Sequence, residues 1–115
     1  MNSNDAVSAL AALAQETRLA VFRLLVQAGD EGIAAGDIAQ QLAVPAATLS
    51  FHLKELAYAG MIASEQLGRN VIYRANYAAM DDLIAYLTDN CCQGGQCLPK
   101  TAAVATSAKR RSKES

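Results

Sequence analysis

The sequence has few aromatic residues, no tryptophan and only two prolines, and its apolar residues never form a long uninterrupted run. A transmembrane helix needs about 18 or more consecutive apolar residues, so we expect no membrane span. Residues 1–5 lack the basic region and apolar stretch of a signal peptide, which predicts a cytoplasmic protein. With 52% hydrophobic residues among 115, rich in Ala and Leu, the chain has the composition of one compact, mainly helical domain.

Positive charge is also scarce in most of the chain. Residues 1–97 carry five Lys or Arg against ten Asp or Glu, whereas residues 98–115 carry five against one. A body with a net charge of −5 is not typical of a nucleic-acid-binding protein. However, three of its five cations lie between residues 54 and 74, so their location matters more than their number.

Apolar periodicity predicts two helices at the start of the chain, over residues 5–14 and 16–28. The second should end at Gly29, since glycine suits the left-handed conformation that closes helices. Arg18 falls on the apolar side of this helix, so we expect it to be hydrogen-bonded or ion-paired. The expected apolar faces are Val7, Leu10, Leu13 and Ala14 in the first helix, and Leu19, Phe22, Leu25 and Val26 in the second.

Residues 35–75 have the pattern of a winged helix-turn-helix. Two short amphipathic helices, 35–42 and 46–58, are separated by Val44-Pro45, where the residue before proline is pushed out of helical geometry. Segments 62–67 and 71–75 flank Gly68-Arg69-Asn70 and predict a hairpin, the wing. A last helix follows over residues 77–90. We therefore expect a mainly α fold with a small β-hairpin in residues 1–92, a cysteine segment at 91–97 and a disordered basic tail at 98–115.

The outer face of helix 46–58 is the candidate DNA-reading surface. Its N-terminal outward residues offer hydroxyl groups and apolar contacts to thymine methyls, as in a recognition helix in the major groove. Lys54 should reach a phosphate, and Arg69 at the hairpin tip a phosphate or a narrow minor groove. His52 is expected to pack and to orient the helix or touch the DNA backbone, not to bind metal. A merely solvated face, or a winged helix that docks protein, would show the same pattern. The predicted DNA-binding residues are Ala47, Thr48, Ser50, Phe51, His52, Lys54, Arg69 and Arg74.

Three cysteines lie within one short segment, Cys91-Cys92-Gln-Gly-Gly-Gln-Cys97. An odd number excludes a fully paired disulfide framework within one chain. Thiolates prefer soft ions, and trivalent arsenic or antimony accepts three sulfurs, whereas structural zinc usually takes four ligands. A redox switch, a site for cadmium, lead or mercury, and incidental residues at a helix end remain alternatives. The thiol count therefore favours a three-coordinate soft ion such as As(III) or Sb(III). We expect no permanent cofactor, and no enzyme activity because no obvious general base accompanies the thiols.

The chain resembles the ArsR/SmtB family of metal-responsive repressors over about residues 5–92. The resemblance lies in residues 13–25, in Thr48-Leu-Ser-Phe-His-Leu-Lys-Glu-Leu56 with residues 59–62, and in the wing, residues 68–74. It implies a homodimer, formed by the first and last helices, that binds a palindromic operator and is released by its inducer.

The position of the cysteines distinguishes this chain from two groups of that family. Residues 34–37, where many of the family's arsenic sensors carry cysteines, contain none, and the last helix has no histidine, unlike the zinc sensors. The sequence is similar to the subgroup whose thiols cluster at the end of the last helix. That resemblance implies that Cys91, Cys92 and Cys97 bind arsenite within one subunit.

Overall fold

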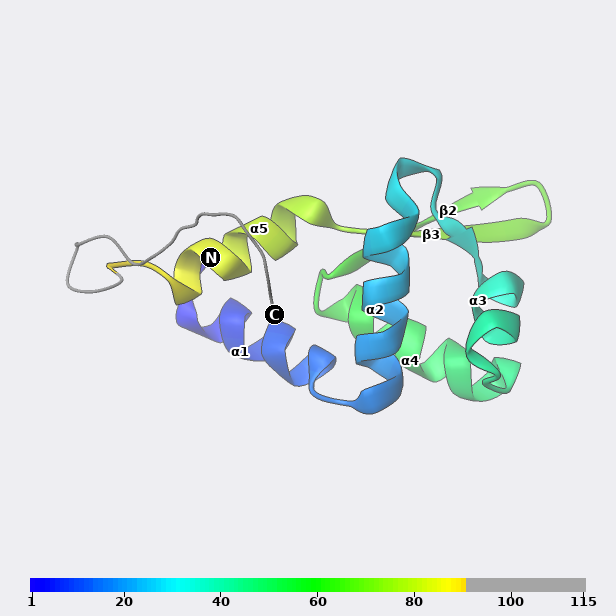
Figure 1. The fold of residues 1–115 in the computed structure, drawn as a ribbon, viewed down its shortest axis with the longest axis horizontal. Helices are drawn as coiled ribbons and strands as arrows, with labels where there is room; N and C mark the ends of the chain where they lie inside the picture. Colours follow the sequence, from blue (N-terminus) through cyan, green and yellow to red (C-terminus); the bar gives the residue numbers. More distant parts are fainter. Residues whose placement is uncertain (91–115) are drawn as a thin grey trace, which may run out of the picture.

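A computed structural model describes residues 1–90 as a winged helix-turn-helix (Figure 1). The helices are α1 (Ser3–Leu13), α2 (Glu16–Ala28), α3 (Ala35–Leu42), α4 (Ala46–Tyr58) and α5 (Tyr77–Leu87), with a short 3-10 turn η1 (Gly29–Glu31). The strands are β1 (Ile33–Ala34), β2 (Ile62–Leu67) and β3 (Asn70–Ala75). The predicted cysteine segment at 91–97 and basic tail at 98–115 lie outside the described residues.

The fold class predicted from the sequence is confirmed, with corrections to the elements. The three strands form an antiparallel sheet in the order β1-β3-β2. The sequence predicted only the β2–β3 hairpin, because β1 has two residues, too few for an alternating pattern to show. The last helix ends at Leu87 and not at residue 90. The hairpin loop consists of Gly68 and Arg69, since Leu67 pairs with Asn70, and Gly68 has a φ of +62°, as a type II′ turn requires at its first central residue.

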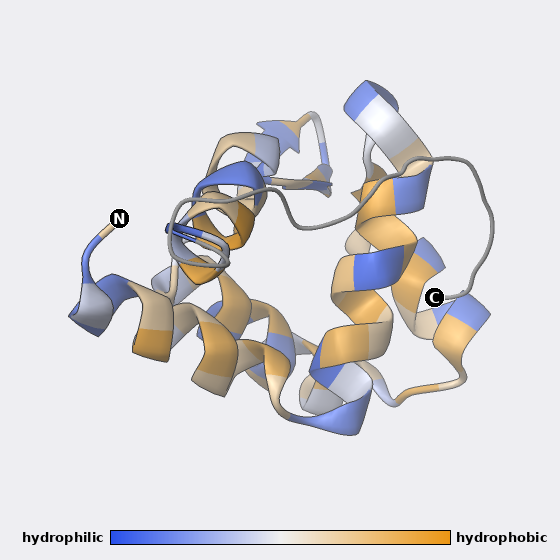
Figure 2. Ribbon diagram, turned by 60° about the vertical axis from the view of Figure 1, so that its left-hand side comes forward, coloured by the Kyte–Doolittle hydropathy of each residue, from blue (hydrophilic) through white to orange (hydrophobic). Residues whose placement is uncertain are grey.

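The core is formed where α2, α3 and α4 meet the start of the sheet. Its largest fully buried side chains are Leu25, Ile38, Leu49, Leu56, Met61 and Val21. Figure 2 shows hydrophobic residues interspersed with hydrophilic ones along the helices. Leu19 does not belong to this core, contrary to the sequence prediction, because its side chain is 45% exposed. The buried face of α2 is centred on Val21, Phe22 and Leu25. At 100° per residue, Leu19 lies about 110° from that centre, whereas Arg18 lies almost on it.

The first helix packs on the core through alanines. Ala6, Ala9 and Ala12 repeat every third residue and are buried, which brings the backbone of α1 close to the domain. Val7 and Leu10, which the sequence placed on the apolar face, stay 62% and 42% exposed. In residues 1–90, therefore, α1 has two apolar sides, and only the alanine side is covered.

The last helix is fastened to the domain at its first residues. The Tyr77 hydroxyl donates to the carbonyl of Val26 at 2.9 Å, near the end of α2, where helix carbonyls lack helical partners. The side chain of Asn76 donates to the carbonyl of Gly60 at 2.9 Å and accepts from the N–H of Ala79 at 3.1 Å. These contacts fix where α5 begins relative to α2 and α4.

Gly32 fixes the approach of the chain to the wing, and Gly32→Ala should destabilise the fold. A Cβ at this position would lie 2.6 Å from the carbonyl oxygen of Tyr73, and the residue has a φ of +70°. Gly29→Ala is the matched control, because Gly29 has a φ of +75° but open space around its Cβ position. We expect the control to lose about 1–3 kcal/mol through backbone strain alone. Urea denaturation should show a larger loss for Gly32→Ala, and equal losses would contradict the steric argument.

Candidate nucleic-acid interface

The turn between α3 and α4 sets the direction of the second helix. Ala43 has a left-handed backbone, with a φ of +55°, and the N–H of Val44 donates to the carbonyl of Ala39 at 3.0 Å. Pro45 then precedes α4, and its carbonyl accepts from the N–H of Leu49 at 2.9 Å. The chain therefore leaves α3 and enters α4 through three residues, as the Val44-Pro45 break predicted.

The outer face of α4 is free in residues 1–90. Leu49, Leu53 and Leu56 are buried beneath it. The predicted contact residues of this outward-facing surface, which we call the α4 face, are all exposed: Ala47, Thr48, Ser50, Phe51 and Lys54. Phe51 is 56% exposed, so its ring is accessible to a partner. The structure thus brings together five of the eight predicted DNA-binding residues, while their contact with DNA remains a prediction.

His52 differs from the five exposed residues of the α4 face, since it is buried, with only 9% of it exposed. Its Nδ1 lies 3.3 Å from Nη1 of Arg18, and its ring makes an edge contact with Phe51 at 5.6 Å between centroids. The sequence predicted that Arg18 would be hydrogen-bonded, which is confirmed. It did not identify the partner, because the two residues are 34 positions apart. The cation on the apolar side of α2 was the signal that this region held a buried polar contact.

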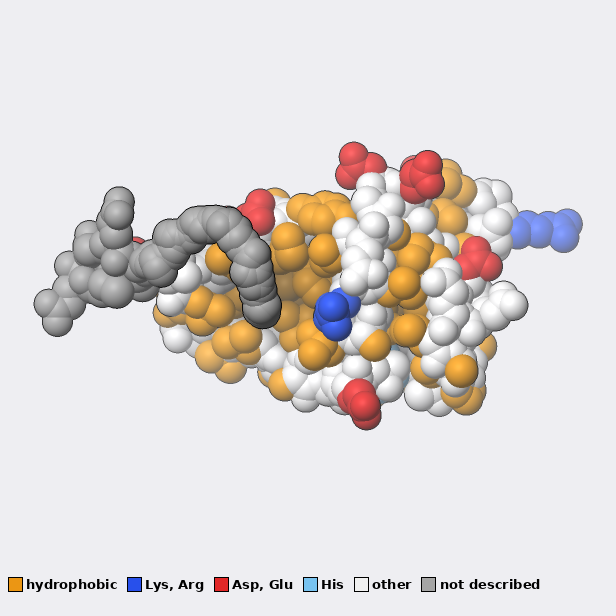
Figure 3. Space-filling model, in the orientation of Figure 1, with side chains coloured by type: hydrophobic (Ala, Val, Ile, Leu, Met, Phe, Trp, Pro, Cys, Tyr) orange, Lys and Arg blue, Asp and Glu red, His pale blue; other side chains and the backbone are white. Residues whose placement is uncertain are grey.

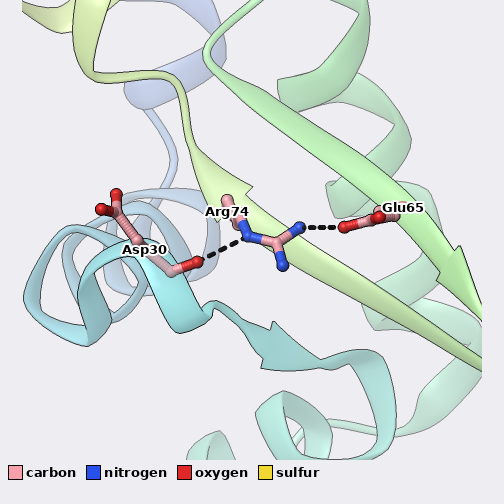
Figure 4. A network of polar contacts seen from close by, with 3 residues as sticks. All are labelled: Asp30, Glu65 and Arg74. Atoms are coloured by element: carbon pink, nitrogen blue, oxygen red, sulfur yellow. Dashed lines mark hydrogen bonds and ion pairs between the residues drawn. The ribbon is translucent and has the colours of Figure 1, made fainter.

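The two arginines of the wing have different surroundings. Arg69 occupies the exposed turn between β2 and β3. Arg74 is held at the surface, with its side chain 32% exposed: Nη1 pairs with Oε1 of Glu65 at 2.8 Å and Nε donates to the carbonyl of Asp30 at 2.7 Å (Figure 4). Arg74 therefore links the wing to η1. A phosphate contact by Arg74 would compete with Glu65, so Arg69 is the better placed of the two.

Charged side chains are sparse on the face drawn in Figure 3, where hydrophobic side chains gather over α1. Within residues 1–90 the Arg74–Glu65 contact is the only ion pair. No group of three His, Cys, Asp or Glu side chains in this part of the chain is arranged to hold a metal ion. The predicted ligands Cys91, Cys92 and Cys97 lie outside the described residues. No helix in the described part is long and apolar enough to cross a membrane.

Comparisons with known proteins agree with this geometry. Residues 13–65 match the helix-turn-helix domain family. An ArsR-like transcriptional regulator from Rhodococcus sp. RHA1 has the same fold, with 27% identity, a TM-score of 0.69, and coverage of 79% of this chain and 83% of that one.

Two further solved structures share the fold. A possible transcriptional regulator for arsenical resistance is 25% identical over 70% of this chain and 80% of that chain, with a TM-score of 0.60. A homodimeric winged helix-turn-helix DNA-binding domain from Mycobacterium bovis is 24% identical over 80% and 85% of the two chains, with a TM-score of 0.60. No curated protein sequence matches the chain.

Proposed function

We propose that this chain is a metalloid-responsive repressor. It binds operator DNA as a homodimer and leaves the DNA when As(III) or Sb(III) binds the thiolates of Cys91, Cys92 and Cys97. The proposal is supported by the chain's fold and helix-turn-helix segment, which are similar to those of ArsR-like transcriptional regulators. The main observation in favour of DNA binding is the exposed α4 face. It lies on the side of α4 opposite the buried leucines, next to a wing that has Arg69 at its tip.

The α4 face has the chemistry of a base-reading surface. Thr48 and Ser50 supply hydroxyl groups at the N-terminal half of α4, and Phe51 and Ala47 supply apolar contact to thymine methyls. Lys54, one turn further along, is suited to a phosphate. Two such helices in a dimer would read two half-sites about one helical turn apart.

The exposed apolar sides of the two terminal helices support the homodimer. Val7 and Leu10 on α1 are 62% and 42% exposed, and Ile84 and Leu87 on α5 are 53% and 58% exposed. We call these four residues the terminal-helix face; α1 and α5 contact one another within the chain. Large apolar side chains gathered on neighbouring helices are typical of a subunit interface.

The inducer is inferred from the cysteines and their place in the sequence. Three thiols match the three sulfurs that As(III) and Sb(III) accept, and one of the similar structures is of a possible regulator for arsenical resistance. Cys91 follows the end of α5 by four residues. Metalloid binding there would act on the helix that carries half of the terminal-helix face, and so on the spacing of the two α4 helices.

A repressor with the same α4 face that responds to thiol oxidation, or to cadmium, lead or mercury, is the second candidate. The adjacent pair Cys91 and Cys92 favours it, since vicinal thiols can oxidise to a disulfide and also bind soft metals. The protein, bound to a duplex selected from a random library, should be titrated with arsenite, antimonite, zinc, cadmium and peroxide. Fluorescence anisotropy then reports release; release by peroxide or cadmium but not by arsenite would favour this candidate.

Arg69→Ala tests the DNA-binding surface. Removing one phosphate contact should lower affinity similarly for all duplex sequences and reduce the slope of log K against log salt by about 1 per subunit. Arg23→Ala is the control, because it removes the same charge from an exposed position on α2. Anisotropy titrations at several salt concentrations measure both. An equal change of slope in the two variants would show that net charge, and not the wing, is responsible.

A further inference from the structure

Arg18 connects the first helix to the DNA-reading helix. Its Nε donates to the carbonyl of Ala12 at 2.7 Å, close to the end of α1, while its Nη1 reaches Nδ1 of His52 on α4. Its backbone N–H is held by the side chain of Gln15 at 2.8 Å, which starts α2. One guanidinium thus touches α1, which carries half of the terminal-helix face, and α4, which carries the α4 face.

The contact between Arg18 and His52 requires a neutral imidazole. A guanidinium has donors and no acceptor, so Nδ1 of His52 must accept and its proton must lie on Nε2. Protonation at Nδ1 would remove the acceptor and place a second positive charge 3.3 Å from Nη1 of Arg18. Because His52 is only 9% exposed, water would screen that repulsion poorly.

No carboxylate offsets this repulsion in residues 1–90. Apart from Arg18, the charged residues on the helices packed against α4 are all exposed: Asp5 on α1, Glu16 and Arg23 on α2, and Asp37 on α3. On β2, which also packs against α4, Glu65 pairs with Arg74. Glu55, one turn along α4, lines a cavity together with Arg18 but forms no ion pair with either Arg18 or His52. Within the described part of the chain, Arg18 is therefore the only charged side chain that is hydrogen-bonded to His52.

A cavity beside Arg18 provides room for water and for rearrangement of the side chains between the two helices. It has a volume of about 320 Å³ and lies between α1 and α4, lined by Arg18 and Glu55 with Ser8, Ala11, Ala12, Tyr58 and Ala59. Water entering it can hydrate the Arg18 guanidinium when the contact with His52 is broken. The junction of α1 and α4 therefore has both a polar contact and the space for an alternative arrangement.

We propose that Arg18 and His52 are positioning residues that hold α4 in its DNA-binding orientation only while the imidazole is neutral, so that acidification weakens DNA binding. This inference rests on the proposed DNA binding. It predicts the opposite sign from simple electrostatics, since a new positive charge on α4 would otherwise strengthen binding to phosphates. The sign of the pH effect therefore distinguishes a positioning contact from a DNA-backbone contact by His52.

The test is the affinity of the full chain for a selected duplex between about pH 7.5 and pH 5.5, a range centred on ordinary histidine titration. His52 is the chain's single histidine, so no other imidazole of the chain can account for a pH effect in this range. At constant ionic strength and with reductant, we expect affinity to fall about tenfold on acidification, a usual size for coupled equilibria. His52→Asn, whose side-chain oxygen is bonded to Cγ as Nδ1 is and accepts without titrating, should bind with little dependence on pH.

Several results would overturn the proposal. These are a wild-type affinity that is constant or rises on acidification, an equal fall in His52→Asn, or unfolding of the wild type at the lower pH in circular dichroism. Ring ¹⁵N shifts of the single histidine give an independent readout, and a neutral ring protonated on Nδ1 would also contradict it. Absence of binding at pH 7.5 would instead contradict the proposed function, so the two failures are distinguishable.

Discussion

Replacing Leu10 and Ile84 together by aspartate should convert the protein to a monomer and lower its affinity for operator DNA by more than about 100-fold. Both side chains belong to the terminal-helix face, where they are 42% and 53% exposed in the single chain. Two aspartates at a subunit interface would bury unpaired charges, which is strongly unfavourable. Loss of the dimer removes the linkage between two half-site contacts, an advantage of about 10²–10⁴ in affinity.

Sedimentation velocity and fluorescence anisotropy measure the two effects. Leu67→Asp is the matched control for oligomeric state, since Leu67 is 48% exposed but lies at the end of β2, away from α1 and α5. The control should sediment as the wild type does. A dimeric Leu10→Asp/Ile84→Asp protein, or a control that dissociates equally, would show that the subunits associate through another surface.

Replacing any one of Cys91, Cys92 and Cys97 by serine should abolish release by arsenite and leave DNA affinity within about twofold of the wild type. In the wild type, arsenite should weaken DNA binding by roughly 5–150-fold, corresponding to a coupling free energy of about 1–3 kcal/mol. A three-coordinate site that loses one thiolate keeps only two soft ligands, because a serine hydroxyl is a hard and weak ligand for arsenic. Linkage also requires that bound DNA weaken arsenite binding by the same factor as arsenite weakens DNA binding.

Anisotropy of a preformed DNA complex, titrated with arsenite, reads out the three variants. The chain contains no other cysteine, so the triple variant is the thiol-free control and should remain on DNA at every arsenite concentration. Undiminished release from all three single variants would exclude the three-thiol site. Release of the triple variant would exclude thiol chemistry as the origin of the response.

The sequence predicted the helix-turn-helix and the exposed side of α4 well because both depend on local signals. The Val44-Pro45 break located the turn within three residues, and the leucine spacing on α4 separated the buried side from Ser50, Phe51 and Lys54. Gly29 and Gly68 have positive φ at a helix end and in a tight turn, but Gly29, with a ψ of −158°, does not adopt the left-handed helical conformation that the sequence predicted. These features follow from chain geometry, which relates positions a few residues apart.

Predictions that depended on tertiary packing were less complete. The sequence placed Leu19 on the buried face of α2, but an apolar stripe by itself does not show which of its edges is covered by a neighbouring element. On α1 the small alanines face the domain and Val7 and Leu10 do not, since close helix packing selects side-chain size as well as hydrophobicity. The two-residue strand β1 exists only because β3 offers it hydrogen-bond partners.

By itself, the sequence determined the order of helices and hairpin, the outward side of α4 and the cluster of three thiols. Helical and strand periodicities are local, and so are the turn residues that separate them. Only the tertiary structure decided that Arg18 meets His52 across 34 residues, that Arg74 is engaged by Glu65 and Asp30, and that residues 1–90 leave the terminal-helix face uncovered. A buried polar group needs a partner, but which distant residue supplies it depends on how the helices pack, and no local pattern specifies that.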